Sequence, residues 1–224
     1  MIVVFDLDDT LYDELTYVKS GFQAVAAFLS KELSVSEQEL FEWMWERLQT
    51  NGRGSIFDDL LIKYNHFSKK LVKQSISVYR MHTPNITLPQ ETLECLETIY
   101  NYPKYIVTDG NKIVQHKKLQ ALGLYKKMKC CYITHRYGIR NAKPSAYCFW
   151  HIAKREKVPP EKIVYVGDNP QKDFVGIKPL GFRTIRVMTG QYRHLEMANE
   201  FEADIRIPSL KQLKDVLDRI KLEK

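Results

Sequence analysis

The first apolar run of the chain is short and unbroken. Residues 2–5 read Ile-Val-Val-Phe, and acidic side chains follow at Asp6 and Asp8. Consecutive β-branched and aromatic residues are typical of a strand buried on both faces, as in the middle of a parallel sheet. In open α/β sheets the ligand crevice lies outside the carboxyl ends of the strands. The pattern therefore predicts that Asp6 stands at a binding or catalytic site.

The apolar spacing changes to a helical period between residues 13 and 83. Apolar residues recur three and four positions apart, which gives a helix one apolar face, as in Leu15, Val18, Phe22, Val25 and Leu29. Ser36 and Glu39 form a capping-box pair before a second helix, and the glycines that flank Arg53 interrupt the pattern. Two further helices are expected, over residues 56–64 and 69–81. This segment therefore predicts four helices and no strand.

From residue 84 onward, apolar segments of strand length alternate with helical ones. Strands are predicted at 104–107, 130–133, 163–166, 183–188 and 203–207. Helices are predicted near Pro89, up to Gly123, from Lys143, and over 209–220. Strands that alternate with helices imply a parallel sheet with helices on both faces. We therefore expect an α/β, Rossmann-like core over 1–12 and 84–224, with an all-helical insertion over 13–83 directly after the first strand.

Polar side chains collect where these strands end. They are Asp6 and Asp8 after the first strand, Thr108 after the second, Lys143 before the fourth, and Asp168 and Asp173 after it. Each has an ordinary structural explanation, because Asp and Thr cap helices and turns and a single lysine usually lies on the surface. A calcium loop that starts at Asp6 would need Gly and Glu where Leu11 and Tyr17 stand. The joint occurrence of these residues at converging strand ends favours one common site.

Composition narrows the class of protein. Of the 224 residues, 44% are hydrophobic and 27% are charged, which is ordinary for a globular protein. No run of about eighteen apolar residues predicts a membrane span. A first segment that reads as a core strand is unlike a cleavable leader, so we expect a cytoplasmic protein. The four cysteines form neither a C-x-x-C pair nor a secretory framework, which predicts reduced thiols.

The formal net charge of +7 is compatible with two kinds of partner. A basic surface can hold nucleic acid, or it can steer small anions toward a cleft. The densest group of lysines is expected to be a solvated helix face, and comprises Lys112, Lys117, Lys118, Lys126, Lys127 and Lys129. The sequence has no basic motif interleaved with aromatic residues. We therefore expect a small anionic substrate and neither a nucleic acid nor a membrane as partner.

The strand-end residues resemble the four motifs of the haloacid dehalogenase superfamily, the Asp-x-Asp-x-Thr phosphohydrolases. The motifs match residues 6–10 (Asp-Leu-Asp-Asp-Thr), Thr108, Lys143 with the proline after it, and residues 167–173 (Gly-Asp-Asn-Pro-Gln-Lys-Asp). The helical insertion resembles the C1-type cap of that superfamily. Thr-Asp-Gly at 108–110 and Leu-Gly-Leu at 122–124 are similar to its nucleotidase and sugar-phosphate phosphatase branches. The resemblance spans nearly the whole chain.

The resemblance implies a reaction in two steps. Asp6 would attack phosphorus and form an aspartyl-phosphate. Asp8 would protonate the leaving oxygen and then deprotonate the attacking water. The expected activity is Mg²⁺-dependent hydrolysis of a small phosphate monoester, either a nucleoside monophosphate or a sugar phosphate.

The resemblance also implies how the metal and the phosphate are held. The ligands of Mg²⁺ would be Asp6, Asp8 through its backbone carbonyl, Asp168, and Asp173, the last acting through water or by orienting Lys143. The phosphoryl oxygens would be bound by Thr108, the N–H of Asp109, and Lys143. Together these residues would offset charge as it moves during phosphoryl transfer.

Other functions of the same residues stay open. A phosphomutase shares all of them and differs in how its cap excludes water. A dehalogenase uses the same nucleophile but has no work for a general acid at Asp8. A receiver module phosphorylated on Asp109 lacks room for a helical insertion over 13–83. A non-catalytic phosphate-binding protein would usually have lost one of the residues.

Substrate choice would depend on the cap and on the loop after the first motif. The candidates are Tyr12, Asp13 and Arg53. Arg53 stands between two glycines and could clamp a second anionic group, although an exposed loop arginine is the alternative. Nucleoside monophosphates and sugar phosphates are equally compatible with the sequence, and so are a monomer and a homodimer.

Overall fold

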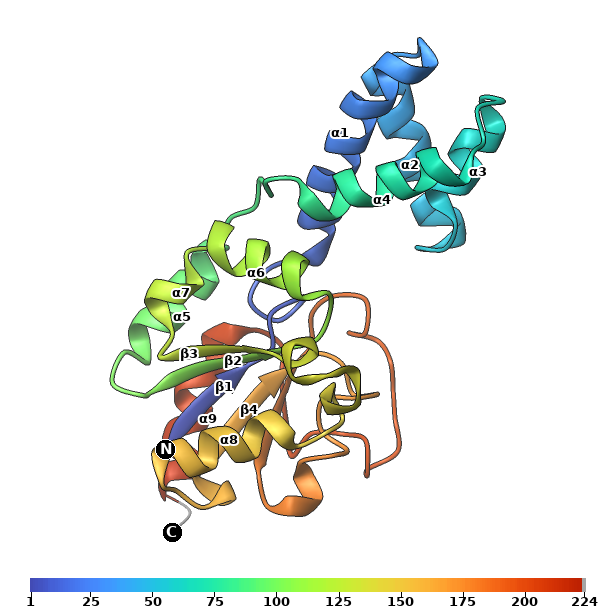
Figure 1. The fold of residues 1–224 in the computed structure, drawn as a ribbon. Helices are drawn as coiled ribbons and strands as arrows, with labels where there is room; N and C mark the ends of the chain where they lie inside the picture. The colour runs from blue at the N-terminus through green and yellow to red at the C-terminus, as the bar shows by residue number, and fades with distance from the viewer. Residues whose placement is uncertain (223–224) are drawn as a thin grey trace. The chain divides into compact units, whose positions relative to one another are not determined.

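A computed structural model describes residues 1–222 of the chain, drawn as a ribbon in Figure 1. These residues form two compact units. The first comprises Met1–Glu14 together with the chain from Thr87 onward, and the second comprises Leu15–Ile86.

The first unit is built on a parallel sheet in the order β3-β2-β1-β4-β5-β6, which counts six strands within residues 1–222. The strands are β1 (Ile2–Phe5), β2 (Lys104–Thr108), β3 (Cys130–Ile133), β4 (Ile163–Gly167), β5 (Arg183–Val187) and β6 (Ile205–Ile207). All four residues of β1 are buried, because β1 pairs with β2 on one side and β4 on the other. The predicted α/β, Rossmann-like sheet is confirmed.

Helices connect the strands and cover the sheet. They are α5 (Gln90–Thr98), α6 (Lys112–Ala121), α7 (Leu124–Lys127), α8 (Tyr147–Glu156) and α9 (Leu213–Leu222). Figure 1 shows α8 in front of the sheet and α9 behind it. Phe149 of α8 packs against Tyr165 of β4 in the core of the front face. Across residues 1–222, no helix combines the length and the hydropathy needed to span a bilayer.

The second unit consists of helices, with no strand among its residues, all of which the structure describes. After α1 (Glu14–Leu33), whose first residue belongs to the first unit, come α2 (Glu37–Asn51), α3 (Ile56–Lys63) and α4 (Lys69–Met81). Their apolar faces form a separate core that includes Phe22, Leu29 and Met44. The Ser36 hydroxyl caps α2 by accepting the N–H of Glu39 at 3.2 Å. The helical period read from the sequence is thus realised by helices that bury their apolar stripes against one another.

The predicted start of the helix at Lys143 is wrong. The helix expected from Lys143 begins only at Tyr147. The segment before it is a loop, because the N–H of Lys143 donates to Oδ1 of Asp109 at 3.1 Å instead of entering a helix. The carbonyl of Pro144 packs on Gly176, where a Cβ would lie only 1.7 Å from the Pro144 oxygen. These contacts fix Lys143 in place without a helix. The last strand is also shorter than predicted, since it begins at Ile205.

Candidate active site

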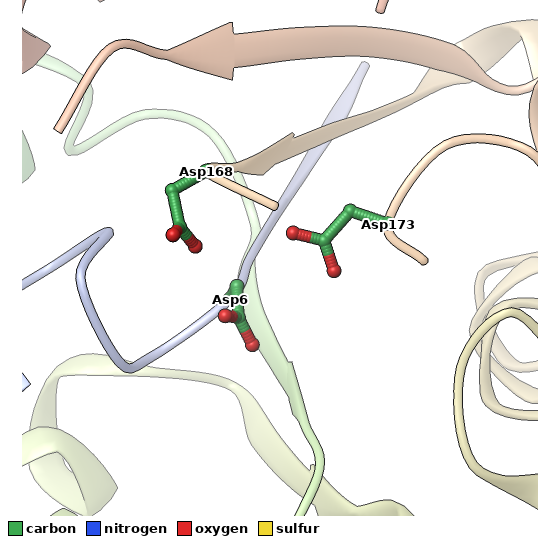
Figure 2. Close-up of side chains that lie close together, drawn as sticks. All are labelled: Asp6, Asp168 and Asp173. Carbon is green, nitrogen blue, oxygen red and sulfur yellow. The ribbon is translucent and has the colours of Figure 1, made fainter. Parts of the chain in front are cut away.

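Three aspartates converge at the carboxyl end of the sheet. Asp6 follows β1, Asp168 follows β4, and Asp173 lies in the turn after β4. Figure 2 shows their carboxyl groups grouped around one point. Each offers an oxygen within 4.8 Å of the others, and each residue is at most 5% exposed. Adjacent parallel strands thus bring together acidic residues that lie far apart in the sequence.

Lys143 reaches into this cluster from its loop. Its ammonium group donates to Oδ1 of Asp6 at 2.8 Å, to Oδ1 of Asp173 at 2.7 Å, and to the hydroxyl of Tyr165 at 2.9 Å. Burial by itself would lower the pKa of Lys143, but Asp173 and Asp6 outweigh it and raise that pKa well above its ordinary value. The lysine is therefore a permanent cation between the first and fourth motifs.

The cluster holds more negative charge than Lys143 compensates. Burial raises the pKa of Asp6 to about 7, although Lys143 opposes the shift. Burial also raises the pKa of Asp168 to about 9, with Asp6 and Asp173 adding to the effect. Buried carboxylates whose ionisation is opposed by burial are suited to a divalent cation with oxygen ligands, because the cation stabilises their charged form. The residues present therefore fit Mg²⁺.

Asp173 has a second set of partners that defines its place. Its Oδ1 accepts from Lys143 and from Tyr165, and its Oδ2 accepts the N–H of Asn169 at 3.0 Å. Gly167 leaves the room for this, because a Cβ there would lie 2.5 Å from Oδ2 of Asp173. Of the two roles considered for Asp173, these contacts favour the orientation of Lys143.

The Asp8 side chain makes a set of contacts that does not include the three clustered aspartates. Its Oδ1 accepts from the Tyr12 hydroxyl and from the Lys118 ammonium group, each at 2.7 Å, and its Oδ2 accepts from Nε2 of Gln115 at 2.8 Å. Lys118 also pairs with Glu14 at 3.0 Å. The Asp8 side chain is 21% exposed, whereas that of Lys118 is 2% exposed. Asp8 is thus held by three donors at the edge of the site.

The expectation that Lys118 belongs to a solvated lysine face is wrong. Burial lowers its pKa, but Asp8 and Glu14 more than offset this, so that the pKa of Lys118 lies above its ordinary value. A signal for this was present in the sequence, because Lys118 lies next to Leu119 and at helical spacing from Leu122, which directly follows α6, and both leucines are buried. The prediction of a solvated lysine face therefore missed the contacts that Lys118 and Gln115 make with Asp8.

The second motif supplies a buried hydroxyl and a structural carboxylate. Thr108 is 1% exposed, and its Oγ1 accepts from Gln115 at 2.7 Å. Oδ1 of Asp109 accepts from the Thr134 hydroxyl at 2.6 Å and from the N–H of Lys143. Burial raises the pKa of Asp109, but Lys143 and the Thr134 hydrogen bond bring it below its usual value. The side chain of Asp109 therefore anchors the loop that carries Lys143.

The three specificity candidates are placed differently. Tyr12 is buried and joins the contacts around Asp8. Asp13 is exposed, and Arg53 is exposed on the loop after α2 in the helical unit. Tyr12 is therefore brought next to a predicted catalytic residue within the first unit.

Comparison with known proteins gives relatives that extend over nearly the full chain. Glyceraldehyde 3-phosphate phosphatase from Methanocaldococcus jannaschii is 28% identical over 98% of this chain and 97% of its own length. The protein of the same name from Pyrococcus furiosus is 28% identical over 97% of this chain and 93% of its own. The solved structure of 2-haloacid dehalogenase from Pseudomonas syringae shares the fold, with a TM-score of 0.66 at 24% identity over 98% of this chain and 99% of that one.

A protein-family sequence model also matches this chain. The matching family is haloacid dehalogenase-like hydrolase, and the match covers residues 1–181, which include all four motifs. Because that match covers well over half of the 224 residues, the chain belongs to the haloacid dehalogenase-like hydrolase family.

Proposed function

We propose that this protein is a Mg²⁺-dependent phosphatase that hydrolyses a small sugar phosphate through an aspartyl-phosphate on Asp6. The observation that carries the proposal is the buried cluster in which Lys143 contacts both Asp6 and Asp173 while Asp168 lies within reach. It joins a nucleophile, a fixed cation and a set of metal-binding oxygens at one point. Phosphoryl transfer needs this combination, because the transferring oxygens carry negative charge that must be offset.

In the first step a carboxylate oxygen of Asp6 attacks phosphorus, and the bond from phosphorus to the ester oxygen breaks. Mg²⁺ bound by Asp6, Asp168 and the carbonyl of Asp8 would supply positive charge for the phosphoryl oxygens. Lys143 adds a second positive charge beside the nucleophile. Thr108 would donate its hydroxyl hydrogen to a phosphoryl oxygen, together with the N–H of Asp109.

Asp8 accounts for the protons of both steps. It gives a proton to the departing alkoxide as the aspartyl-phosphate forms, which leaves Asp8 ionised. It then takes a proton from the water that attacks phosphorus, which releases inorganic phosphate and restores Asp6. A dehalogenase has no leaving alkoxide to protonate, so the contacts built around Asp8 favour phosphate ester chemistry over dehalogenation.

The relatives favour a sugar phosphate over a nucleoside monophosphate as substrate. Two of them, matched along nearly their full length, are named for glyceraldehyde 3-phosphate. A triose phosphate is therefore the first substrate to test.

We further propose that the helical unit is a C1-type cap. Two residues would contribute to substrate choice, Asp13 in the loop after the first motif and Arg53 in the helical unit. A phosphomutase is the alternative function, because it shares the residues of the core site.

The test measures inorganic phosphate released from a panel of phosphate monoesters in the presence of Mg²⁺. We expect turnover of triose and other sugar phosphates, loss of turnover in EDTA, and loss in Asp6→Asn, because an amide neither attacks phosphorus well nor binds Mg²⁺ well. Turnover retained by Asp6→Asn would contradict the aspartyl-phosphate. An isomerised sugar phosphate without release of phosphate would show a mutase instead.

A further inference from the structure

Two side chains of α6 contact Asp8, although the reaction described above gives neither of them a role. Gln115 and Lys118 lie three positions apart, on one face of the helix, and each is 2% exposed. Between them they contact both carboxylate oxygens of Asp8. A buried lysine is uncommon unless it is paired, and here the first of its partners is the residue to which proton transfer is assigned.

The contacts of Gln115 determine the direction of a hydrogen bond at Thr108. The amide nitrogen of Gln115 donates to Oδ2 of Asp8 at 2.8 Å. The same nitrogen lies 2.7 Å from Oγ1 of Thr108, which therefore accepts from Gln115. The hydroxyl hydrogen of Thr108 is then left to donate in another direction. Gln115 thus makes Thr108 a donor for a phosphoryl oxygen and fixes one oxygen of Asp8 at the same time.

Lys118 fixes the other oxygen of Asp8. Its ammonium group and the Tyr12 hydroxyl both donate to Oδ1. Because Oδ2 is bound to Gln115, the carboxyl group of Asp8 cannot rotate about its Cβ–Cγ bond without breaking contacts at both oxygens. Lys118 also holds Glu14, the last residue of the first unit before the helical unit begins.

We propose that Lys118 and Gln115 are positioning residues, which hold the carboxyl group of Asp8 in the orientation for proton transfer to an alkoxide leaving group, while Gln115 also directs the hydroxyl of Thr108. The inference rests on the proposed function, since it assumes that Asp8 is the general acid and base. It deepens that function because it ties the enzyme to alkyl phosphates, whose leaving oxygen needs a proton. Geometry of this kind contributes to rate because a displaced proton donor loses much of its effect.

The experiment compares two substrates in single-turnover formation of the phospho-enzyme. Glyceraldehyde 3-phosphate has an alkoxide leaving group, whereas p-nitrophenyl phosphate departs with little need of a proton. General acid catalysis is worth roughly 10²- to 10⁴-fold, so Lys118→Met should slow the step about 10- to 100-fold for the triose phosphate. For p-nitrophenyl phosphate the slowing should stay below about threefold, because proton transfer to that leaving group contributes little.

A double-mutant cycle separates positioning from a general structural effect. If Lys118 acts through Asp8, then Lys118→Met should add no further slowing to Asp8→Asn, because residues that act as a unit are not additive. Gln115→Met should behave differently. It should slow both esters, and part of its effect should persist beside Asp8→Asn, because it also removes the partner of Thr108.

Controls keep the outcome interpretable. Lys117→Met changes the neighbouring, partly exposed lysine of α6 and should leave both rates unchanged. Lys118→Arg retains the cation and should recover most of the loss for the triose phosphate. If Lys118→Met does not fold, Lys118→Met combined with Glu14→Gln removes the unpaired acidic partner and repeats the measurement.

The proposal is overturned if Lys118→Met, alone or with Glu14→Gln, slows both esters equally, or if its effect adds in full to that of Asp8→Asn. Failure of the proposed function looks different. In that case the wild-type protein forms no phospho-enzyme from either ester, or Asp8→Asn itself shows no preference between the two leaving groups.

Discussion

Among residues 1–222, the first unit contains two buried lysines, and their surroundings differ in how charge is balanced. Lys143 contacts Asp6 and Asp173 deep in the acidic cluster, where Asp168 is a further carboxylate close by. Lys118 contacts Asp8 and Glu14, whose side chains are 21% and 17% exposed. The carboxylates around Lys143 are almost fully buried, whereas those around Lys118 retain contact with solvent.

This difference indicates which of the two sets of residues suits a bound cation. Around Lys143, burial raises the pKa of Asp6 to about 7 and that of Asp168 to about 9, so the excess negative charge is not stabilised by water or by the lysine. Around Lys118, water can solvate part of the charge, and hydrogen bonds from Tyr12 and Gln115 reach the same carboxylate. The surroundings of Lys143 are therefore suited to bind a cation. Those of Lys118 are suited to hold the carboxyl group of Asp8 in one orientation.

The largest expected effect is that of Lys143→Met. Removing one partner of a buried ion pair costs about 3–5 kcal/mol, because the remaining charge is buried without compensation. The free energy of unfolding from urea titration without metal should fall by about that amount, and phospho-enzyme formation should be lost. Lys118→Met should destabilise less, because its carboxylate partners are partly solvated. A larger loss of stability in Lys118→Met would contradict the comparison.

A second prediction concerns pH and the metal. The folded protein without metal keeps protons on Asp6 and Asp168 at pH values where the unfolded chain has released them, since both pKa values are raised from 3.8. The folded state then binds more protons, so stability should fall as pH rises from about 4 to about 9. Mg²⁺ must displace these protons, and its stabilising effect should therefore grow over the same range.

Thermal unfolding with EDTA and with Mg²⁺, across that pH range, tests the prediction. Asp168→Asn is the matched variant, because it removes the carboxyl group with the larger pKa shift and should flatten both dependences. A stabilising effect of Mg²⁺ that is the same at low and high pH would count against these aspartates as the binding site.

A smaller effect is expected for Tyr12→Phe. The change removes one neutral donor to Oδ1 of Asp8 and leaves the ammonium group of Lys118 in place. A net hydrogen bond is worth about 0.5–1.5 kcal/mol, so the rate with a sugar phosphate should fall by about tenfold at most. Single-turnover rates check this, and a loss that exceeds that of Lys118→Met would show that Tyr12 is the principal partner of Asp8.

The smallest effect is expected for Glu14→Gln. Its carboxylate is 17% exposed, and Lys118 keeps its ion pair with Asp8 when Glu14 is neutralised. Turnover of a sugar phosphate should stay within about threefold of wild type, because Lys118 still donates to Asp8. A greater loss than in Tyr12→Phe would indicate that Lys118 works through Glu14 instead.

Much of the core follows from the sequence because parallel strands share one edge. The apolar run before Asp6 and the one before Asp168 predicted two strands, and these strands pair directly in the structure. Once both are in one parallel sheet, the residues after them must lie close together. The helical period between residues 13 and 83 likewise predicted the helices, because the repeat of apolar positions defines which face each helix buries.

Tertiary structure decided the partners of the charged residues. Lys118 belongs by sequence to a run of lysines, yet it is buried against Asp8, 110 positions away. Arg186 lies within β5 and is fully buried, where it pairs with Glu202 at 2.7 Å and donates to the carbonyl of Asp168 at 3.3 Å. Lys143 is held by loop contacts to Asp109 rather than by a helix. A local pattern determines which face of an element is apolar, because that depends on the spacing of its own residues. It does not determine whether a charge is solvated or paired, because that depends on which distant carboxylate the fold brings opposite it.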